Sequence, residues 1–206
     1  YVFYFFAYLV FNYFCSMKNV EGQKLILGSG SPRRKEILSL AGFEFEVLVS
    51  DVEENYPEDL TLRNVPEFLA IKKARAIQEQ FKIENRPILT ADTIVLINNE
   101  ILGKPVDRED AIQILQKLSG ATHEVLSGVC YLYRNEFQTL TDTTKVTFNN
   151  IDLKDIEYYV DQFQPYDKAG AYAIQEWIGV RYISKIEGCY YNVMGLPMTK
   201  ILQELF

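Results

Sequence analysis

The chain has 206 residues and a formal net charge of −7 at pH 7, with 28 Asp and Glu against 21 Lys and Arg. This length suits one domain with a sizeable core, and the acidic balance argues against nucleic acid or an anionic membrane surface as the main partner. Three widely spaced cysteines and a single histidine make a structural zinc site improbable and indicate a reducing compartment, the cytoplasm.

Residues 1–16 form an apolar extension unlike the rest of the chain. Nine aromatic residues and no charge fall within residues 1–14. A signal peptide would begin with basic residues and end at a small-residue cleavage site, and a transmembrane helix needs about 20 residues. We therefore interpret residues 1–16 as upstream sequence outside the native fold, with a membrane anchor as the alternative. Met17 then begins a single domain, 17–206.

From Lys24 onward predicted strands and helices alternate, which indicates the α/β class. Predicted strands cover residues 24–28, 43–49, 87–98, 122–133, 137–148 and 180–186. Predicted helices cover residues 32–40, 64–81, 107–118, 152–163 and 195–205. Because crossovers and long hairpins are combined, we expect a mixed sheet rather than a purely parallel one.

The segment 25–34 runs from an apolar strand through a small-residue turn into a helix. Ser31 is a candidate N-cap, and Pro32 suits the first helical position. The helix N-terminus carries about half a positive charge and unpaired N–H groups, and Arg33 and Arg34 add two cations there. The segment predicts a phosphate site, although it matches neither a P-loop nor a dinucleotide fingerprint. The alternative is a capped surface helix with two solvated arginines.

Two charged side chains stand where folding alone would favour apolar ones. Asp92 interrupts the apolar run 88–97, so its carboxylate should be paired, bound to a metal or placed beside a cleft at the open end of the strand. It is a candidate metal ligand or general base, or a structural carboxylate that caps a loop. Lys73 falls on the apolar stripe of the predicted helix 64–81 and must snorkel or reach into a cavity.

Three further signals are weaker when each is taken alone. Glu53 and Glu54 lie in an acidic loop, where paired carboxylates are usually solvated, but acids from two segments can hold a divalent cation that also contacts substrate phosphates. Lys104 lies in a tight Gly-Lys-Pro loop. His123 indicates a hydrogen bond within the fold rather than chemistry.

Eight segments, taken together and in order, resemble the motifs of the Maf family of nucleoside triphosphate pyrophosphatases. They are residues 28–34, 50–54, 73–76, 91–95, 103–105, 118–123, 167–175 and 193–197. The resemblance covers the chain from about Leu25 to its end, and the first sixteen residues have no counterpart. It implies a mixed, twisted central sheet flanked by helices, of the same general architecture as inosine triphosphatases, with the active site in a cleft between two lobes.

The resemblance also implies a reaction, in which a nucleoside triphosphate and water give the monophosphate and pyrophosphate with Mg²⁺ or Mn²⁺. Arg33 after Ser-Pro, Thr93 after Asp, and the segment 168–175 look like the branch that hydrolyses dTTP and UTP rather than 7-methyl-GTP. Ala173 replaces a usual glycine, which tightens the expected base pocket. A homodimer is compatible with the resemblance.

Combined with the residue-level reasoning, the resemblance assigns roles in catalysis. Asp92 is the expected base for the attacking water, and either Glu53 or Glu54 would hold the divalent ion together with Asp92. Lys73 and Lys104 would neutralise charge on the pyrophosphate leaving group.

The resemblance and the residue types together also imply substrate-binding roles. The triphosphate would be cradled by the helix N-terminus and four side chains: Ser29, Ser31, Arg33 and Arg34. Thr93 and Gln175, with Arg34, are candidates for reading the pyrimidine. Lys168 would either contact phosphate or brace its loop.

Two other functions remain open at this point. One is a pyrophosphatase of the same architecture that removes deaminated purine nucleotides such as ITP or XTP, which a substrate panel would separate. The other is a nucleotide-binding regulator of cell division and septum formation, for which hydrolysis would be incidental.

Overall fold

The computed structural model describes residues 22–206, so the predictions for residues 1–16 and Met17 fall outside the described residues. Seven strands form one sheet in the order β2-β1-β3-β5-β6-β7, with β4 paired to β3. β1 pairs in parallel with β2 and β3, and the other pairs are antiparallel. The predicted mixed α/β sheet is confirmed.

The strands are β1 (Leu25–Leu27), β2 (Phe45–Val47), β3 (Ile88–Ile97), β4 (Glu100–Leu102), β5 (Thr122–Tyr133), β6 (Glu136–Phe148) and β7 (Ile183–Glu187). The helices are α2 (Pro32–Leu40), α3 (Val65–Phe81), α4 (Arg108–Leu118), α5 (Leu153–Phe163), α6 (Trp177–Tyr182), α7 (Tyr190–Val193) and α8 (Met198–Glu204). Short 3₁₀ turns are η1 (Leu62–Asn64), η2 (Pro165–Asp167) and η3 (Ala169–Ala171).

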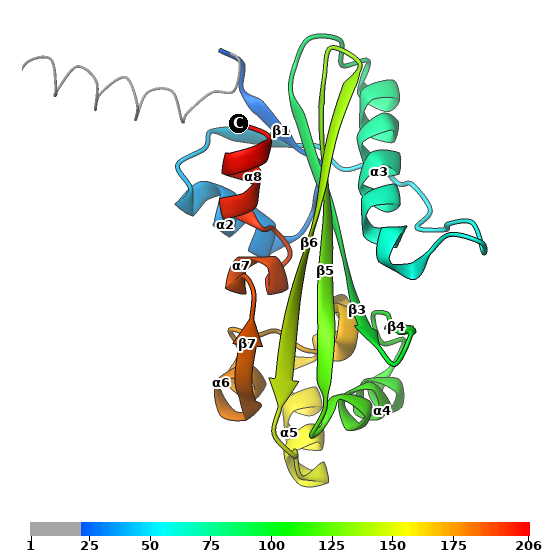
Figure 1. Cartoon of the computed structure of the whole chain (residues 1–206), viewed down its shortest axis with the longest axis vertical. Coiled ribbons are helices and arrows are strands. Elements are labelled where there is room, and N and C mark those ends of the chain that lie inside the picture. The colour runs from blue at the N-terminus through cyan, green and yellow to red at the C-terminus, as the bar shows by residue number, and fades with distance from the viewer. Residues whose placement is uncertain (1–21) are drawn as a thin grey trace, which may run out of the picture.

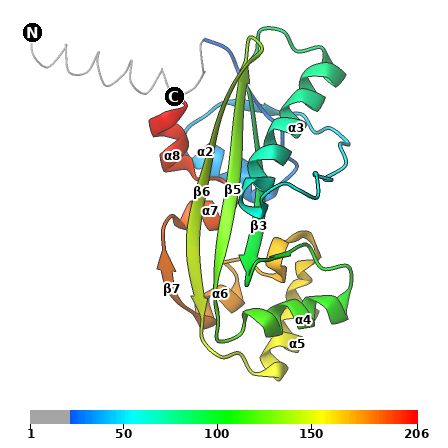
Figure 2. The same cartoon turned by 45° about the vertical axis from the view of Figure 1, so that its right-hand side comes forward.

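The helices are divided between the two ends of the long strands β3, β5 and β6. Around one end, α2 and α8 lie on one side and α3 on the other, whereas α4, α5 and α6 gather at the opposite end (Figures 1 and 2). This division gives the two lobes that the sequence analysis expects. None of the helices in the part of the chain that the structure describes combines the length and apolar character needed to cross a membrane.

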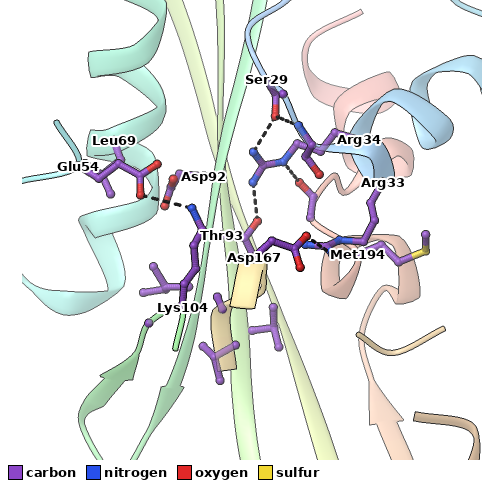
Figure 3. Close-up of a pocket in the computed structure, with 18 of the residues that line it drawn as sticks. Ser29, Arg33, Arg34, Glu54, Leu69, Asp92, Thr93, Lys104, Asp167 and Met194 are labelled. Carbon is purple, nitrogen blue, oxygen red and sulfur yellow. Dashed lines mark hydrogen bonds and ion pairs between the residues drawn. The ribbon is translucent and has the colours of Figure 1, made fainter. Parts of the chain in front are cut away.

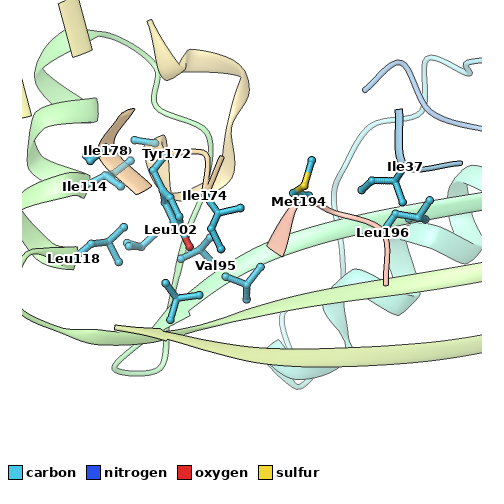
Figure 4. Close-up of a cluster of buried hydrophobic side chains, with 14 of the residues drawn as sticks. Ile37, Val95, Leu102, Ile114, Leu118, Tyr172, Ile174, Ile178, Met194 and Leu196 are labelled. Atoms are coloured by element: carbon cyan, nitrogen blue, oxygen red, sulfur yellow. The ribbon is translucent and has the colours of Figure 1, made fainter. Parts of the chain in front are cut away.

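Side chains of β3 alternate between two buried layers, as a period of two requires. Leu89, Val95 and Ile97 belong to the largest apolar cluster, whereas Ile88 and Ile94 belong to smaller clusters on the α3 side. Figure 4 shows this cluster extending from Ile114 and Leu118 of α4, at one end of the long strands, to Ile37 of α2 at the other. β3 is therefore buried on both faces.

The sheet is open along one part of β3, and this opening positions the site. β1 pairs with β3 only at Ile88 and Leu89, and β4 pairs with it only from Val95 to Ile97. Between these pairings, β3 has a strand neighbour on the β5 side alone among the described residues. Asp92 and Thr93 stand in this gap, on opposite faces of the strand.

Two predicted elements near the C-terminus have the predicted type but begin three residues later than predicted. The predicted strand 180–186 is helical through Tyr182, because Gly179 brings α6 against the backbone of Ile174 and the strand begins only at Ile183. The predicted helix 195–205 begins at Met198, because Gly195 adopts a φ of +106° and interrupts the helix after α7. In both places tertiary packing overrides the local pattern.

Candidate active site

A cleft of about 780 Å³ lies between the lobes, at the opening beside β3. Its walls come from the loops after β1, β2 and β4, the first turn of α2, the helix α3, the strand β3 and two C-terminal segments (Figure 3). Ten of the twelve predicted site residues line it: Ser29, Ser31, Arg33, Arg34, Glu54, Lys73, Asp92, Thr93, Lys104 and Gln175. Glu53 and Lys168 are the two that do not.

Lys73 connects the two carboxylates of the predicted catalytic set. Its Nζ lies 2.5 Å from Asp92 Oδ1 and 2.7 Å from Glu54 Oε1, and Lys104 Nζ lies 3.8 Å from Glu54 Oε2. Asp92 is only 7% exposed. Its ion pair with Lys73 offsets the cost of desolvating this buried carboxylate. Of the two predicted alternatives for Lys73, snorkelling or reaching into a cavity, the structure shows the second.

The cations around Glu54 keep it ionised. Burial raises the pKa of this carboxyl, but the hydrogen bond and charge of Lys73, with Lys104 and Arg34, outweigh burial and hold the pKa below its usual value. The cleft therefore presents carboxylate oxygens and ammonium groups side by side at neutral pH.

Arg34 joins three segments that are distant in the chain. Its Nε donates to the Gly195 carbonyl at 2.8 Å, Nη1 to Ser29 Oγ at 3.1 Å and Nη2 to Thr93 Oγ1 at 3.0 Å. Burial lowers the pKa of Arg34 from its usual value, but arginine is so basic that it stays charged at neutral pH. Arg34 holds the loop after β1, strand β3 and the turn after α7 together.

The start of α2 differs in one detail from the prediction. Ser31 occupies the N-cap position and Pro32 the first turn, but the Ser31 side chain makes no capping hydrogen bond. Instead the Ser31 backbone N–H donates to Ser29 Oγ at 3.2 Å. The first N–H groups of α2 therefore have no side-chain acceptor of their own, as an anion-binding helix end requires.

Lys168 braces its loop, which is one of its two predicted roles. Its side chain is buried, with Nζ 2.6 Å from Asp167 Oδ1 and 3.5 Å from Glu176 Oε1. Asp167 Oδ2 in turn lies 3.7 Å from Arg33 Nη1, across the cleft (Figure 3). The loop 167–176 is thus tied to the first turn of α2 through Asp167.

Glu53 does not line the cleft. Its carboxylate accepts a hydrogen bond from Asn55 Nδ2 at 2.9 Å, and its backbone carbonyl accepts one from Lys72 Nζ at 2.8 Å. Of the two acids that the sequence analysis leaves open, the structure brings Glu54 to Asp92.

The pair formed by Glu54 and Asp92 fits a hard divalent cation. Mg²⁺ is usually held by one or two carboxylates together with substrate phosphates rather than by a cage of protein ligands. In residues 22–206 no group of three or more His, Cys, Asp or Glu side chains forms such a cage.

Residues 24–206 match the family model described as Maf-like protein. The chain belongs to the Maf family. It is 46% identical over 188 residues to the dTTP/UTP pyrophosphatase of Flavobacterium johnsoniae, covering 91% of this chain and 96% of that protein. The corresponding protein of Porphyromonas gingivalis is 45% identical over 191 residues, covering 92% and 96%. That of Bacteroides fragilis is 44% identical over 190 residues, covering 92% and 98%.

Several residues of this Maf cleft received no role from the sequence. Asp167 lines it opposite Arg33, and the Gly195 carbonyl accepts from Arg34. Ser127 and Asn192 lie fully buried behind Thr93. The sequence does mark two of these residues, because Asp167 stands in a motif segment and Ser127 is a polar residue within the apolar strand β5. The Gly195 backbone carbonyl leaves no mark in the sequence.

His123 is structural in this Maf domain, as predicted. It is 1% exposed, its Nε2 lies 2.7 Å from Tyr172 Oη, and its ring stacks on Phe148 with centroids 5.7 Å apart. Burial lowers the pKa of His123 to about 4. The imidazole is therefore neutral in the folded protein at neutral pH.

This pKa predicts an acid-dependent loss of stability. Between pH 6.5 and about 4 the unfolded chain binds a proton at His123 that the folded protein does not. We expect this one group to lower the free energy of unfolding by about 3 kcal/mol across that window, with its contribution fully present above pH 6.5. Urea unfolding at pH 7, 5 and 4 measures it, and His123→Gln should show a smaller loss. Equal pH dependence in both proteins would contradict the prediction.

Proposed function

We propose that this chain hydrolyses dTTP and UTP to the nucleoside monophosphate and pyrophosphate. The observation that carries the proposal is the Asp92–Lys73–Glu54 cluster, which faces the arginine-rich start of α2 across one cleft. Relatives that share 44–46% of their residues over about nine-tenths of this chain carry the name dTTP/UTP pyrophosphatase, which supports the choice of nucleotide.

The triphosphate binds at the start of α2. Ser29, Ser31 and Arg33 line the cleft there, beside the helix N–H groups. Arg34 uses three of its five N–H donors on protein oxygens, so two are left for the base of the substrate, beside Thr93. A phosphate oxygen at Arg33 takes the place of Asp167, whose ion pair with Arg33 is long and half exposed.

Asp92 accepts the proton of the attacking water. Its burial and its contact with Lys73 hold the carboxylate at a fixed position in the cleft. Water bonds to the α-phosphorus as the bond to pyrophosphate breaks. Lys73 and Lys104 neutralise the charge that develops on the departing pyrophosphate. Positioning and charge stabilisation of this kind supply most of the rate in phosphoryl chemistry.

Glu54 and Asp92 would hold Mg²⁺ or Mn²⁺. When bound, the ion supplies positive charge to the phosphate oxygens. Lys73, whose Nζ lies beside both carboxylates, would add a second positive charge next to the phosphates. Thr93 and Gln175, on the remaining wall of the cleft, read the base.

A substrate panel tests the proposal. The full chain is incubated with dTTP, UTP, CTP, ITP, XTP and 7-methyl-GTP in Mg²⁺, in Mn²⁺ and in excess chelator, and pyrophosphate is assayed separately from phosphate. We expect pyrophosphate from dTTP and UTP and its loss in chelator. Preference for ITP or XTP would favour the purine-cleansing reading. A folded protein that yields no pyrophosphate would favour the cell-division regulator.

The setting of the reaction is also part of the proposal. We place it in the cytoplasm, a choice supported by the free thiols of Cys130 and Cys189. A homodimer is the expected assembly, on the strength of family membership alone, and light scattering on the purified chain measures it.

A further inference from the structure

We propose that Ser127 is a positioning residue that fixes the direction of the Thr93 hydroxyl, so that the cleft wall offers a hydrogen-bond acceptor and selects a base with an imide N–H. The proposal rests on the function proposed above and concerns how uracil and thymine are distinguished from cytosine at the same site.

Four groups form one continuous chain of hydrogen bonds behind the cleft. Arg34 Nη2 donates to Thr93 Oγ1 at 3.0 Å, Thr93 Oγ1 lies 2.8 Å from Ser127 Oγ, and Ser127 Oγ lies 3.0 Å from the Asn192 carbonyl oxygen. Figure 3 shows the first of these contacts at the cleft wall. Ser127 and Asn192 are fully buried, so water cannot replace either partner.

The chemistry of the two ends sets the direction of every bond between them. A carbonyl oxygen only accepts, so the single hydroxyl proton of Ser127 points to Asn192. Thr93 must then donate its own single proton to Ser127. A guanidinium only donates, so Arg34 uses one of the two lone pairs of Thr93. Thr93 is left with no proton and one free lone pair.

The frame around this chain is rigid. Thr93 and Ser127 are direct partners in the β3–β5 pairing. The Asn192 side chain donates to the Val125 carbonyl at 3.0 Å and to Thr144 Oγ1 at 2.9 Å, which ties α7 to β5 and β6. The acceptor for the Ser127 proton therefore cannot turn away.

An acceptor at this position has a consequence for the ligand. A phosphate oxygen and the N3 of cytosine are acceptors, so either would face the free lone pair of Thr93 Oγ1 without a proton between them and would be repelled. The N3–H of uracil or thymine is a donor, flanked by carbonyl groups that suit the N–H donors left on Arg34. Cytosine presents the reverse pattern, an acceptor flanked by an amine. Uracil and thymine share the favoured edge, which explains why dTTP and UTP would be accepted together.

Ser127→Ala tests this inference in the full chain. The variant removes the acceptor of the Thr93 proton, so the hydroxyl is free to rotate and to donate to cytosine N3. The Asn192 carbonyl keeps the Gly195 N–H, 2.9 Å away, so no buried carbonyl loses its last partner. We expect the ratio of kcat/KM for UTP to that for CTP to fall about tenfold.

Thr90→Val is the matched control. Thr90 is a buried threonine on the same strand, and its hydroxyl donates to the Ala70 carbonyl at 2.7 Å, away from the cleft. Its loss should leave the UTP to CTP ratio within twofold of wild type. A folded Ser127→Ala enzyme with an unchanged ratio would overturn the inference.

Thr93→Val provides a second test that does not depend on Ser127. Removing the acceptor should lower kcat/KM for UTP at least tenfold and that for CTP by much less. Equal losses would overturn the inference, because Thr93 would then act only as part of the wall. Wild-type hydrolysis of UTP tests the proposed function separately. If the wild type hydrolyses UTP but the variants give the contradicting results, only the inference about Ser127 and Thr93 is overturned. If the wild type hydrolyses neither UTP nor dTTP, the inference and the proposed function are both overturned.

Discussion

Asp92→Asn is expected to lower kcat for dTTP and UTP by about 10²- to 10³-fold with the fold intact. The amide keeps the shape of the carboxylate, and its oxygen can still accept from Lys73 Nζ, which lies 2.5 Å from Asp92 Oδ1. What is lost is the negative charge, and with it the basicity that takes a proton from the attacking water and one of the two carboxylates that would hold the divalent ion. Steady-state release of pyrophosphate measures kcat, and circular dichroism checks the fold.

Asp161→Asn is the matched control for this prediction. Asp161 of α5 carries an exposed carboxylate that pairs with Arg108 of α4, with Arg108 Nε 2.6 Å from Asp161 Oδ1. Asp161 does not line the cleft. Its turnover should equal that of the wild type. A folded Asp92→Asn enzyme that keeps more than a tenth of wild-type kcat would contradict the assignment of Asp92 as the base.

Two members of the Asp92–Lys73–Glu54 cluster were predictable because each breaks a pattern in the sequence. Asp92 interrupts an apolar strand and Lys73 an apolar helix stripe, and a buried charge needs a partner. When two such residues have opposite charge and lie on neighbouring elements, each is therefore the expected ion-pair partner of the other. The choice between Glu53 and Glu54 was not predictable, because adjacent residues in a loop follow no period that assigns one of them to the cleft.

The wall of the cleft was predictable only in part. The hydroxyl and guanidinium of Thr93 and Arg34 stand in recognisable motifs, but the bond from Arg34 to Gly195 joins residues 161 positions apart. The acceptor there is a backbone carbonyl, which every residue possesses. Its position depends on the turn after α7, where the positive φ of Gly195 keeps that residue out of the helix that the local pattern begins there.

The C-terminal strand shows the same limit. Residues 180–186 have the composition of a strand, yet α6 continues through Tyr182 and leaves Val180 82% exposed. The close approach of Gly179 to Ile174 decides this, and it involves a contact between helix and loop that no window of local sequence contains. Long strands and helices with a strong period were predicted within a few residues, whereas elements set by such contacts were not.

Gly128→Ala is expected to lower the free energy of unfolding by about 3 kcal/mol or more and Tm by about 6–12 °C. A Cβ at Gly128 would lie 2.2 Å from Glu67 N, 2.3 Å from Pro66 C and 2.5 Å from Glu67 Cα. All three are backbone atoms in the first turn of α3, so no side-chain rotation relieves the clash. Either α3 or β5 must shift.

The surroundings of Gly128 resist such a shift. The Glu67 carboxylate accepts hydrogen bonds from Thr139 at 2.8 Å and Thr141 at 3.0 Å, which anchors the same turn of α3 to β6. A helix displaced from β5 strains these bonds and also moves Lys73, one turn and a half further along, away from Asp92. Gly128→Ala should therefore lose pyrophosphatase activity together with stability, although Gly128 contacts no substrate.

Gly103→Ala controls for the loss of a glycine as such. Its added Cβ would meet no atom within 4 Å, so thermal unfolding followed by circular dichroism should give a Tm within about 2 °C of wild type. A Gly128→Ala protein with an equally small change would show that α3 and β5 separate at little cost. The close contact between them would then not be what holds Lys73 beside Asp92, and the position of Lys73 would have to rest on its ion pairs alone.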